Sequence, residues 1–107
     1  MAERRKLAAL LGLGFRGRLV VVGVEQVRVE AKKGTVQLAV VAHDASRHSR
    51  DKIVPLLRAK GIDIIEMMSA DELGAAFGRE QTAAVGITDA GLARGVRAIG
   101  LDNARSE

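Results

Sequence analysis

The stretch QLAVVA at residues 37–42 decides the fold class of this chain. All but its first residue are apolar, and an uninterrupted apolar run of this length is typical of a strand covered on both faces. Further short segments rich in apolar residues occur at 19–22, 62–67 and 83–87, and segments with helical spacing alternate with them. We therefore predict a layered α/β fold in which helices cover both faces of a central sheet.

The first helices are predicted from the period of the apolar residues and from signals at their ends. Residues 3–11 place leucines at i, i+3 and i+4, and we expect this helix to end where glycines punctuate the chain at positions 12, 14 and 17. Residues 24–33 return to helical spacing and stop at Gly34, a residue that readily adopts the left-handed conformation after a helix end.

The second half of the chain continues the alternation. A helix is predicted over residues 49–60 with Ser49 as a possible cap, and Pro55 predicts a kink or a later start because proline has no backbone N–H. Ser69 and Glu72 have the spacing of a capping box, which predicts that a short helix follows them.

The resulting order, αβαβαβαβα, fits within one domain. A last helix is expected behind Thr88 or Asp89 and through about residue 99. We predict a single domain over residues 1–101, followed by a flexible tail at residues 102–107. The length of 107 residues is that of one ordinary domain.

Composition excludes several classes of protein. The absence of cysteine rules out disulfide scaffolds, thiolate zinc sites and cysteine nucleophiles. With two Phe, no Tyr and no Trp, the chain cannot build an aromatic platform for stacked bases. No run approaches the ~18 apolar residues needed to span a bilayer. The basic start does not continue as a signal peptide, because Arg16 and Arg18 stand where a cleavage site is expected, so we expect a cytoplasmic protein.

The charge is distributed unevenly along the chain. Residues 1–60 hold 13 Lys and Arg against 5 Asp and Glu, whereas residues 61–107 hold 4 Arg against 8 Asp and Glu. A basic amino-terminal half predicts a polyanionic partner, nucleic acid first and an anionic membrane second. The alternative is a small basic protein with no specific anionic partner.

Two motifs of this chain are similar to nucleotide-binding and metal-binding motifs of other proteins, but neither predicts such a site here. Gly12, Gly14 and Gly17 match G-x-G-x-x-G, but a nucleotide site needs a strand before the motif and a helix after it, and the predicted order is reversed. His43, Asp44 and His48 lack the further ligand that a metal site requires. We predict no cofactor, no metal and no catalytic residue; an enzyme that uses His43 and Asp44 is a distant alternative.

The helix predicted at residues 24–33 carries the strongest candidate binding surface. Its apolar stripe faces the core, so Val29 on the opposite face is expected to be exposed. The free amides and positive dipole end at Gly23, together with the polar side chains of the helix, suit a phosphate backbone and base edges. A solvated charged face is the alternative. The side chains concerned are Gln26, Arg28, Lys32 and Lys33.

Five segments of the chain occur in a distinctive order and spacing. They are LGL and GRLV (11–13, 17–20), the glycines at 23 and 34, AHDAS (42–46), LGAAFGRE (73–80) and VGITD (85–89). In this order they resemble the ribosomal L7Ae superfamily of kink-turn RNA-binding proteins, in its small bacterial YlxQ-like branch. The resemblance covers residues 7–99 and implies a three-layer αβα sandwich around a four-stranded mixed sheet.

The resemblance also implies where RNA binds. Members of the superfamily hold kinked RNA with the start of the second helix and with the loop before the last strand. Their helix motif is Gly-x-Asn-Glu-x-x-Lys, in which Gly23 matches here while Glu25, Gln26 and Val29 replace the Asn, the Glu and the Lys. The implied RNA-binding residues are Gly23, Glu25, Gln26, Arg28, Lys32, Lys33, Arg79, Glu80, Gln81, Thr82 and Ala83.

The function implied is that of a monomeric RNA-binding protein that recognises kink-turn or internal-loop RNA and is linked to translation or the ribosome. Its partners would be structured RNA and ribosomal or ribonucleoprotein components, with no membrane involved. Because Glu25 is an anion and Val29 offers no phosphate contact, the alternative is a protein–protein interaction module on the same fold.

Overall fold

The strand predicted from QLAVVA is β2 (Leu38–Val41), and all of its residues are buried. The computed structural model describes residues 2–105, and within them four strands form one sheet in the order β1-β4-β2-β3. β4 (Ala84–Ile87) lies between β1 (Val20–Val22) and β2 and runs antiparallel to both, while β3 (Ile64–Ile65) runs parallel to β2. The prediction of a four-stranded mixed sheet is confirmed.

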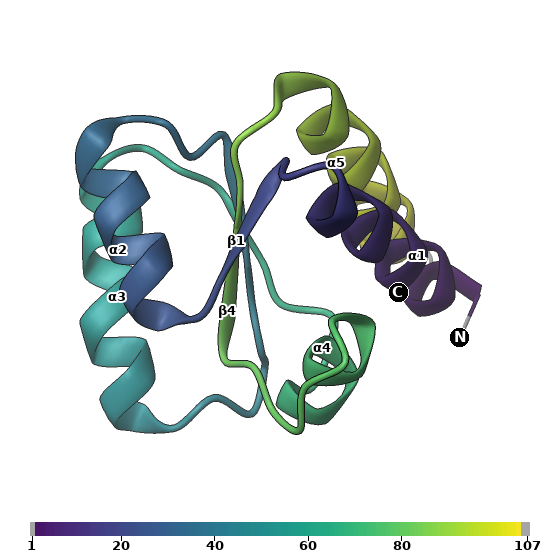
Figure 1. The fold of residues 1–107 in the computed structure, drawn as a ribbon, viewed down its shortest axis with the longest axis horizontal. Helices are drawn as coiled ribbons and strands as arrows, with labels where there is room; N and C mark the ends of the chain where they lie inside the picture. Colours follow the sequence, from purple (N-terminus) through teal and green to yellow (C-terminus); the bar gives the residue numbers. More distant parts are fainter. Residues whose placement is uncertain (1, 106–107) are drawn as a thin grey trace.

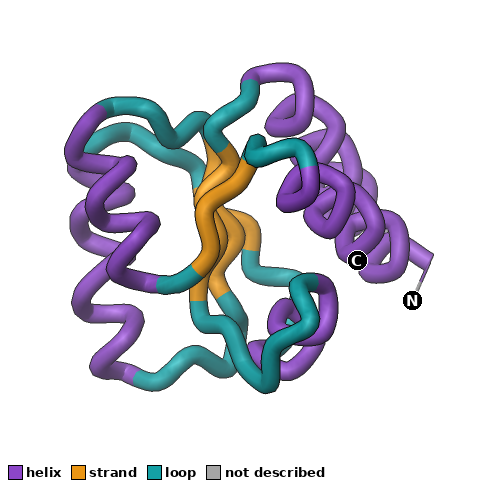
Figure 2. Tube along the Cα trace, viewed as in Figure 1, coloured by secondary structure: helices purple, strands orange, loops and turns teal. Residues whose placement is uncertain are grey.

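Helices cover both faces of this sheet, as Figures 1 and 2 show. On one face lie α2 (Val24–Lys33) and α3 (Arg47–Ala59). On the other face lie α1 (Ala2–Arg16), α4 (Ala70–Ala76) and α5 (Ala90–Arg105). The element order agrees with the predicted alternation, and the three-layer αβα sandwich is confirmed.

The core consists of two apolar layers that share β2. Leu38 and Val40 belong to the layer under α1, α4 and α5, whereas Ala39 and Val41 belong to the layer under α2 and α3. Successive residues of a strand point to opposite faces, so a strand buried on both faces must be apolar throughout.

The first helix is longer than predicted. α1 continues through Gly12 and Gly14 to Arg16 rather than ending near residue 11. A glycine inside a helix costs about 1 kcal/mol relative to alanine. Here Gly14 is buried, and a Cβ at this position would lie 2.4 Å from Leu92 Cδ2. The glycine allows α1 to approach α5 closely, and this packing maintains the helix.

The ends of α3 also differ from the prediction. Ser46, not Ser49, is the N-cap, because its Oγ accepts a hydrogen bond from the backbone N–H of Ser49 at 3.1 Å. The helix therefore begins earlier than predicted rather than later, and it continues through Pro55.

Two further elements differ in length. β3 contains only Ile64 and Ile65, because its ladder with β2 covers only these residues. The last helix begins after Asp89, whose carboxylate accepts from Leu92 N at 2.8 Å, and continues past residue 99 to Arg105. The predicted flexible tail at 102–107 stays a prediction, and its last two residues lie outside the described part of the chain.

Replacing a core residue of β2 should cost far more stability than replacing an exposed leucine. Leu38→Ala, at a fully buried position, should lower the free energy of unfolding by about 2–5 kcal/mol in urea denaturation. Leu13→Ala is the matched control, since Leu13 is 60% exposed and its loss should cost no more than about 0.5 kcal/mol. Similar losses for the two variants would contradict this description of the core.

Candidate nucleic-acid interface

The start of α2 presents open backbone amides. Gly23, the N-cap, has φ 101° and ψ 150°, a conformation in which an L side chain is strained. No side chain caps this end, and the first backbone bond of the helix runs from Val27 N to Gly23 O at 3.0 Å. The amides of residues 24–26 therefore have no partner within the helix, as at any uncapped helix start.

The loop before β4 lies directly beside this helix start. The backbone N–H of Gly23 donates to Ala84 O at 2.9 Å, and that of Ala42 donates to Ala83 O at 2.8 Å. The ends of β1 and β2 thus lie on either side of the start of β4. The structure brings together the two segments that the resemblance implied, the start of α2 and residues 79–83 (Figure 1).

Gly74 in α4 holds this loop close. Its carbonyl accepts from Arg79 N at 2.8 Å, and Thr82 N donates to Ala70 O at 3.0 Å. A Cβ on Gly74 would lie only 2.8 and 2.9 Å from the carbonyl oxygens of Glu80 and Arg79. Sequence reasoning missed Gly74 as a functional position; the available signal was a glycine inside a predicted helix, which often marks close packing.

The short helix α4 is itself held by side chains at its start. The predicted capping box is confirmed: Ser69 Oγ accepts from Glu72 N at 3.1 Å, and Glu72 accepts from Ser69 N at 2.9 Å. Asp44 adds a third bond, accepting from Ala70 N at 2.8 Å. These bonds fix the helix against which the loop packs.

Asp44 therefore has a structural role, and the cluster around it does not form a metal centre. His43 and His48 are exposed. Among residues 2–105, no three His, Cys, Asp or Glu side chains are grouped so that they could hold a metal ion.

The loop side chains differ in their accessibility. Arg79, Glu80 and Gln81 are exposed, and Gln81 Nε2 donates to Asp71 Oδ1 at 3.0 Å. Thr82 is only 4% exposed, and its hydroxyl has no hydrogen-bond partner among residues 2–105. As a correction to the predicted set, Thr82 does not present its side chain at the surface, and it joins the loop to α4 through its backbone N–H.

Two of the predicted contacts on α2 face α3. The Arg28 guanidinium donates to Lys52 O, and Lys52 Nζ lies 3.4 Å from Glu25 Oε1. Gln26 is exposed, and Val29 is 45% exposed, which confirms the expected exposure of that valine. Of the polar side chains in the first turns of α2, Gln26 is thus the one without a partner among the described residues.

Lys32 and Lys33 lie at the other end of the helix. With a rise of 1.5 Å per residue, Lys32 is about 13 Å along the axis from Gly23. Lys33 is also paired with Glu30 at 3.3 Å. The structure therefore does not bring these two predicted contact residues to the loop at 79–83.

Comparison with known proteins agrees with this architecture. A family model described as the ribosomal protein L7Ae/L30e/S12e/Gadd45 family matches residues 4–96. The chain belongs to this family. This L7Ae-family chain is also 31% identical to the RNA-binding protein YlxQ of Bacillus subtilis over 84 residues, which are 78% of this chain and 84% of that protein.

Two solved structures share the fold. A protein of unknown function from Bacillus halodurans superposes with a TM-score of 0.81 at 30% identity, covering 89% of this chain and 96% of that one. The 15.5 kD RNA-binding protein of Giardia lamblia superposes with a TM-score of 0.78, covering 95% of this chain and 88% of that one; at 19% identity it shows the fold alone.

Family membership confirms two expectations from the sequence. The resemblance to the L7Ae superfamily and its YlxQ-like branch was correct, and the L7Ae-family chain is not an enzyme. In addition, none of the helices in the described residues is long and apolar enough to cross a bilayer.

Adding a methyl group at Gly74 should displace the loop. Gly74→Ala should lower the free energy of unfolding by about 1–3 kcal/mol, because the new Cβ meets backbone atoms rather than flexible side chains. Amide NMR shifts should change most at residues 79–82. The control is Gly95→Ala in α5, whose Cβ would meet Leu10 Cδ1 at an ordinary 3.6 Å and which should be neutral or stabilising. Unchanged loop shifts in Gly74→Ala would contradict the close packing.

The capping box should make part of the stability depend on pH. The hydrogen bond from Ser69 N, aided by Arg4, lowers the pKa of Glu72 below its ordinary value of 4.5. This contribution is complete above the ordinary pKa and is lost as pH falls through the lowered pKa of the folded state. Glu72→Gln retains an acceptor but does not titrate. The difference in unfolding free energy between wild type and this variant should therefore shrink on acidification, and a constant difference would contradict the assignment.

Proposed function

We propose that this L7Ae-family chain binds structured RNA, containing a kink turn or an internal loop, at the α2–loop interface. We use this term for Gly23, Gln26, the exposed residues 79–81 and Ala83. The observation that carries the proposal is the 2.9 Å hydrogen bond from Gly23 N to Ala84 O. This bond joins the uncapped start of α2 to the end of the loop before β4, so that the two can form one surface.

The proposed mechanism is recognition without chemistry. The amides and positive dipole end at the start of α2 favour a phosphate, and the Gln26 amide can both donate to and accept from a base edge. The loop at 79–83, held by Gly74, offers a rigid shape against which unpaired nucleotides pack, as in the usual recognition of RNA loops and bulges.

Aromatic stacking has no part in this proposal. The two phenylalanines of the chain, Phe15 and Phe77, pack edge to face with ring centroids 5.3 Å apart and join α1 to α4. A binder that relies on a helix start and a loop does not need such a platform.

The proposed setting is the cytoplasm, with ribosomal or ribonucleoprotein RNA as the partner. Support comes from the family, whose description names ribosomal proteins, and from the relative named as the RNA-binding protein YlxQ. A protein–protein interaction module on this fold is the second candidate, and the exposed Val29 together with the Glu25 carboxylate favours it.

Fluorescence anisotropy with two labelled RNAs separates these candidates. The chain should bind a kink-turn RNA at least about tenfold more tightly than a straight duplex of equal length, which corresponds to about 1.4 kcal/mol. Gln26→Ala should lose about 1–3 kcal/mol of affinity for the kink-turn RNA, and its affinity for the duplex should be unchanged.

The matched control is Gln37→Ala, an exposed glutamine at the start of β2, at the opposite end of the sheet. It should retain the wild-type ratio of kink-turn affinity to duplex affinity. Equal affinity of the wild type for the two RNAs would contradict specific recognition, and absence of binding to either would favour the interaction module.

A further inference from the structure

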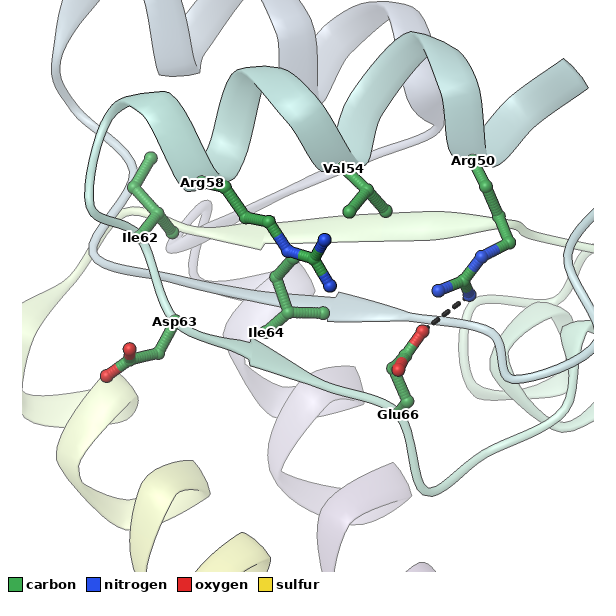
Figure 3. A pocket seen from close by; sticks show the side chains of 7 residues that line it. All are labelled: Arg50, Val54, Arg58, Ile62, Asp63, Ile64 and Glu66. Carbon is green, nitrogen blue, oxygen red and sulfur yellow. Dashed lines mark hydrogen bonds and ion pairs between the residues drawn. The ribbon is translucent and has the colours of Figure 1, made fainter. Parts of the chain in front are cut away.

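The basic residues near the α2–loop interface are largely engaged with partners. Arg50 pairs with Glu66 in the groove between α3 and β3 (Figure 3), and Arg47 lies 4.0 Å from Asp51. Lys52 pairs with Glu25, and Arg28 donates to a carbonyl. Arg79 is the exception, since no described residue forms an ion pair with it. This end of the molecule therefore offers little free positive charge to a polyanion.

The opposite end of the sheet differs. There, β1 and β2 begin and β4 ends, since Thr88 N donates to Leu19 O and Gln37 N donates to Ile87 O. β3 begins beside β2, because Ala39 N donates to Asp63 O. These four neighbouring strand ends span about 14 Å at the usual spacing of strands.

Six exposed basic side chains flank these strand ends, and we call them the far basic surface. They precede β1, β2 and β3 in the chain or follow β4, and all but one make no ion pair or side-chain hydrogen bond within the described residues. The exception is Lys33, which pairs with Glu30. The residues are Arg16, Arg18, Lys32, Lys33, Lys60 and Arg94.

The acidic groups at this end are already engaged. Glu30 pairs with Lys33 and also accepts from Thr35, and Asp63 pairs with Arg97 at 2.7 Å. Asp89 accepts from the Leu92 amide at the start of α5. The excess of positive charge is therefore free to face an external anion.

We propose that the far basic surface binds the phosphate backbone of an RNA segment other than the one held at the α2–loop interface. Exposed Lys and Arg side chains, five of the six without an ion pair among the described residues, surround strand ends that span about 14 Å and suit a polyanion whose charges repeat every few ångströms. Contacts to phosphates carry no sequence information directly. The proposal rests on the proposed function for its choice of RNA as the polyanion. It gives the protein two RNA contacts at opposite ends of the strands, one for shape and one for charge.

The test combines charge removal with a salt series. Lys32→Gln with Arg94→Gln removes two unpaired cations from the two helical layers. This variant should bind a straight RNA duplex on the order of 10- to 100-fold more weakly at 0.1 M salt, with a slope of log K against log salt that is less steep by about two. Its affinity for kink-turn RNA should fall by a similar factor, with the preference over duplex unchanged.

The matched control is Arg5→Gln with Lys6→Gln. It removes the same charge from exposed positions near the start of α1, far along the helix from Arg16. This variant should retain the wild-type salt slope. Thermal denaturation should show that both double variants are as stable as the wild type, because none of the four side chains forms an ion pair in the described residues.

The outcomes separate the two proposals. The proposal for the far basic surface would be overturned if the Lys32 and Arg94 variant kept the wild-type duplex affinity and salt slope, or if the control lost as much duplex affinity as this variant. Either result would leave the proposed kink-turn recognition intact. Duplex binding that depends on Lys32 and Arg94 without preference for the kink turn would support the surface and contradict the proposed function. Absence of binding to both RNAs by the wild type would overturn both proposals.

Discussion

The position of β4 between β1 and β2 is the constraint on which the rest of this structure depends. Because β4 runs antiparallel to both neighbours, its first residue must lie beside the last residues of β1 and β2. The hydrogen bonds of Gly23 N to Ala84 O and of Ala42 N to Ala83 O are the direct result. The loop before β4 and the start of α2 are therefore neighbours for topological reasons, although about sixty residues separate them in the chain.

The same constraint creates the opposite end of the molecule. Where β4 ends, β1 and β2 begin, so the turns after α1 and α2 and the start of α5 lie around one edge. α2 spans the distance between the two ends, and its Gly23 end and its Lys32 end face different surroundings. The ion pairs differ between the two ends: Glu25, Glu66 and Glu72 each pair with a basic residue, whereas most basic residues at the far edge have no acidic partner among the described residues.

Local signals predicted a large part of the fold. The capping box of Ser69 and Glu72, the boundaries of α2 and the left-handed Gly34 were all predicted correctly, because each depends on residues within one or two helical turns. One local prediction failed, because the N-cap of α3 is Ser46 rather than Ser49, and the other failures concern tertiary packing. The sequence alone does not show that Gly14 packs against Leu92, or that β3 pairs with β2 over only two residues, since both depend on segments far away in the chain.

The candidate site divides in the same way. The sequence by itself determined the fold class, through the apolar run of β2, and it determined that α2 begins at Gly23. Both follow from short segments, because the first depends on a run of apolar residues and the second on the conformation of one glycine. Only the tertiary structure decided which residues meet there. It placed residues 79–83 beside Gly23, buried Thr82, turned Glu25 and Arg28 toward α3, and moved Lys32 and Lys33 to the other end. The physical reason is that strand order and helix length set these distances, and neither is encoded in the spacing of any single motif.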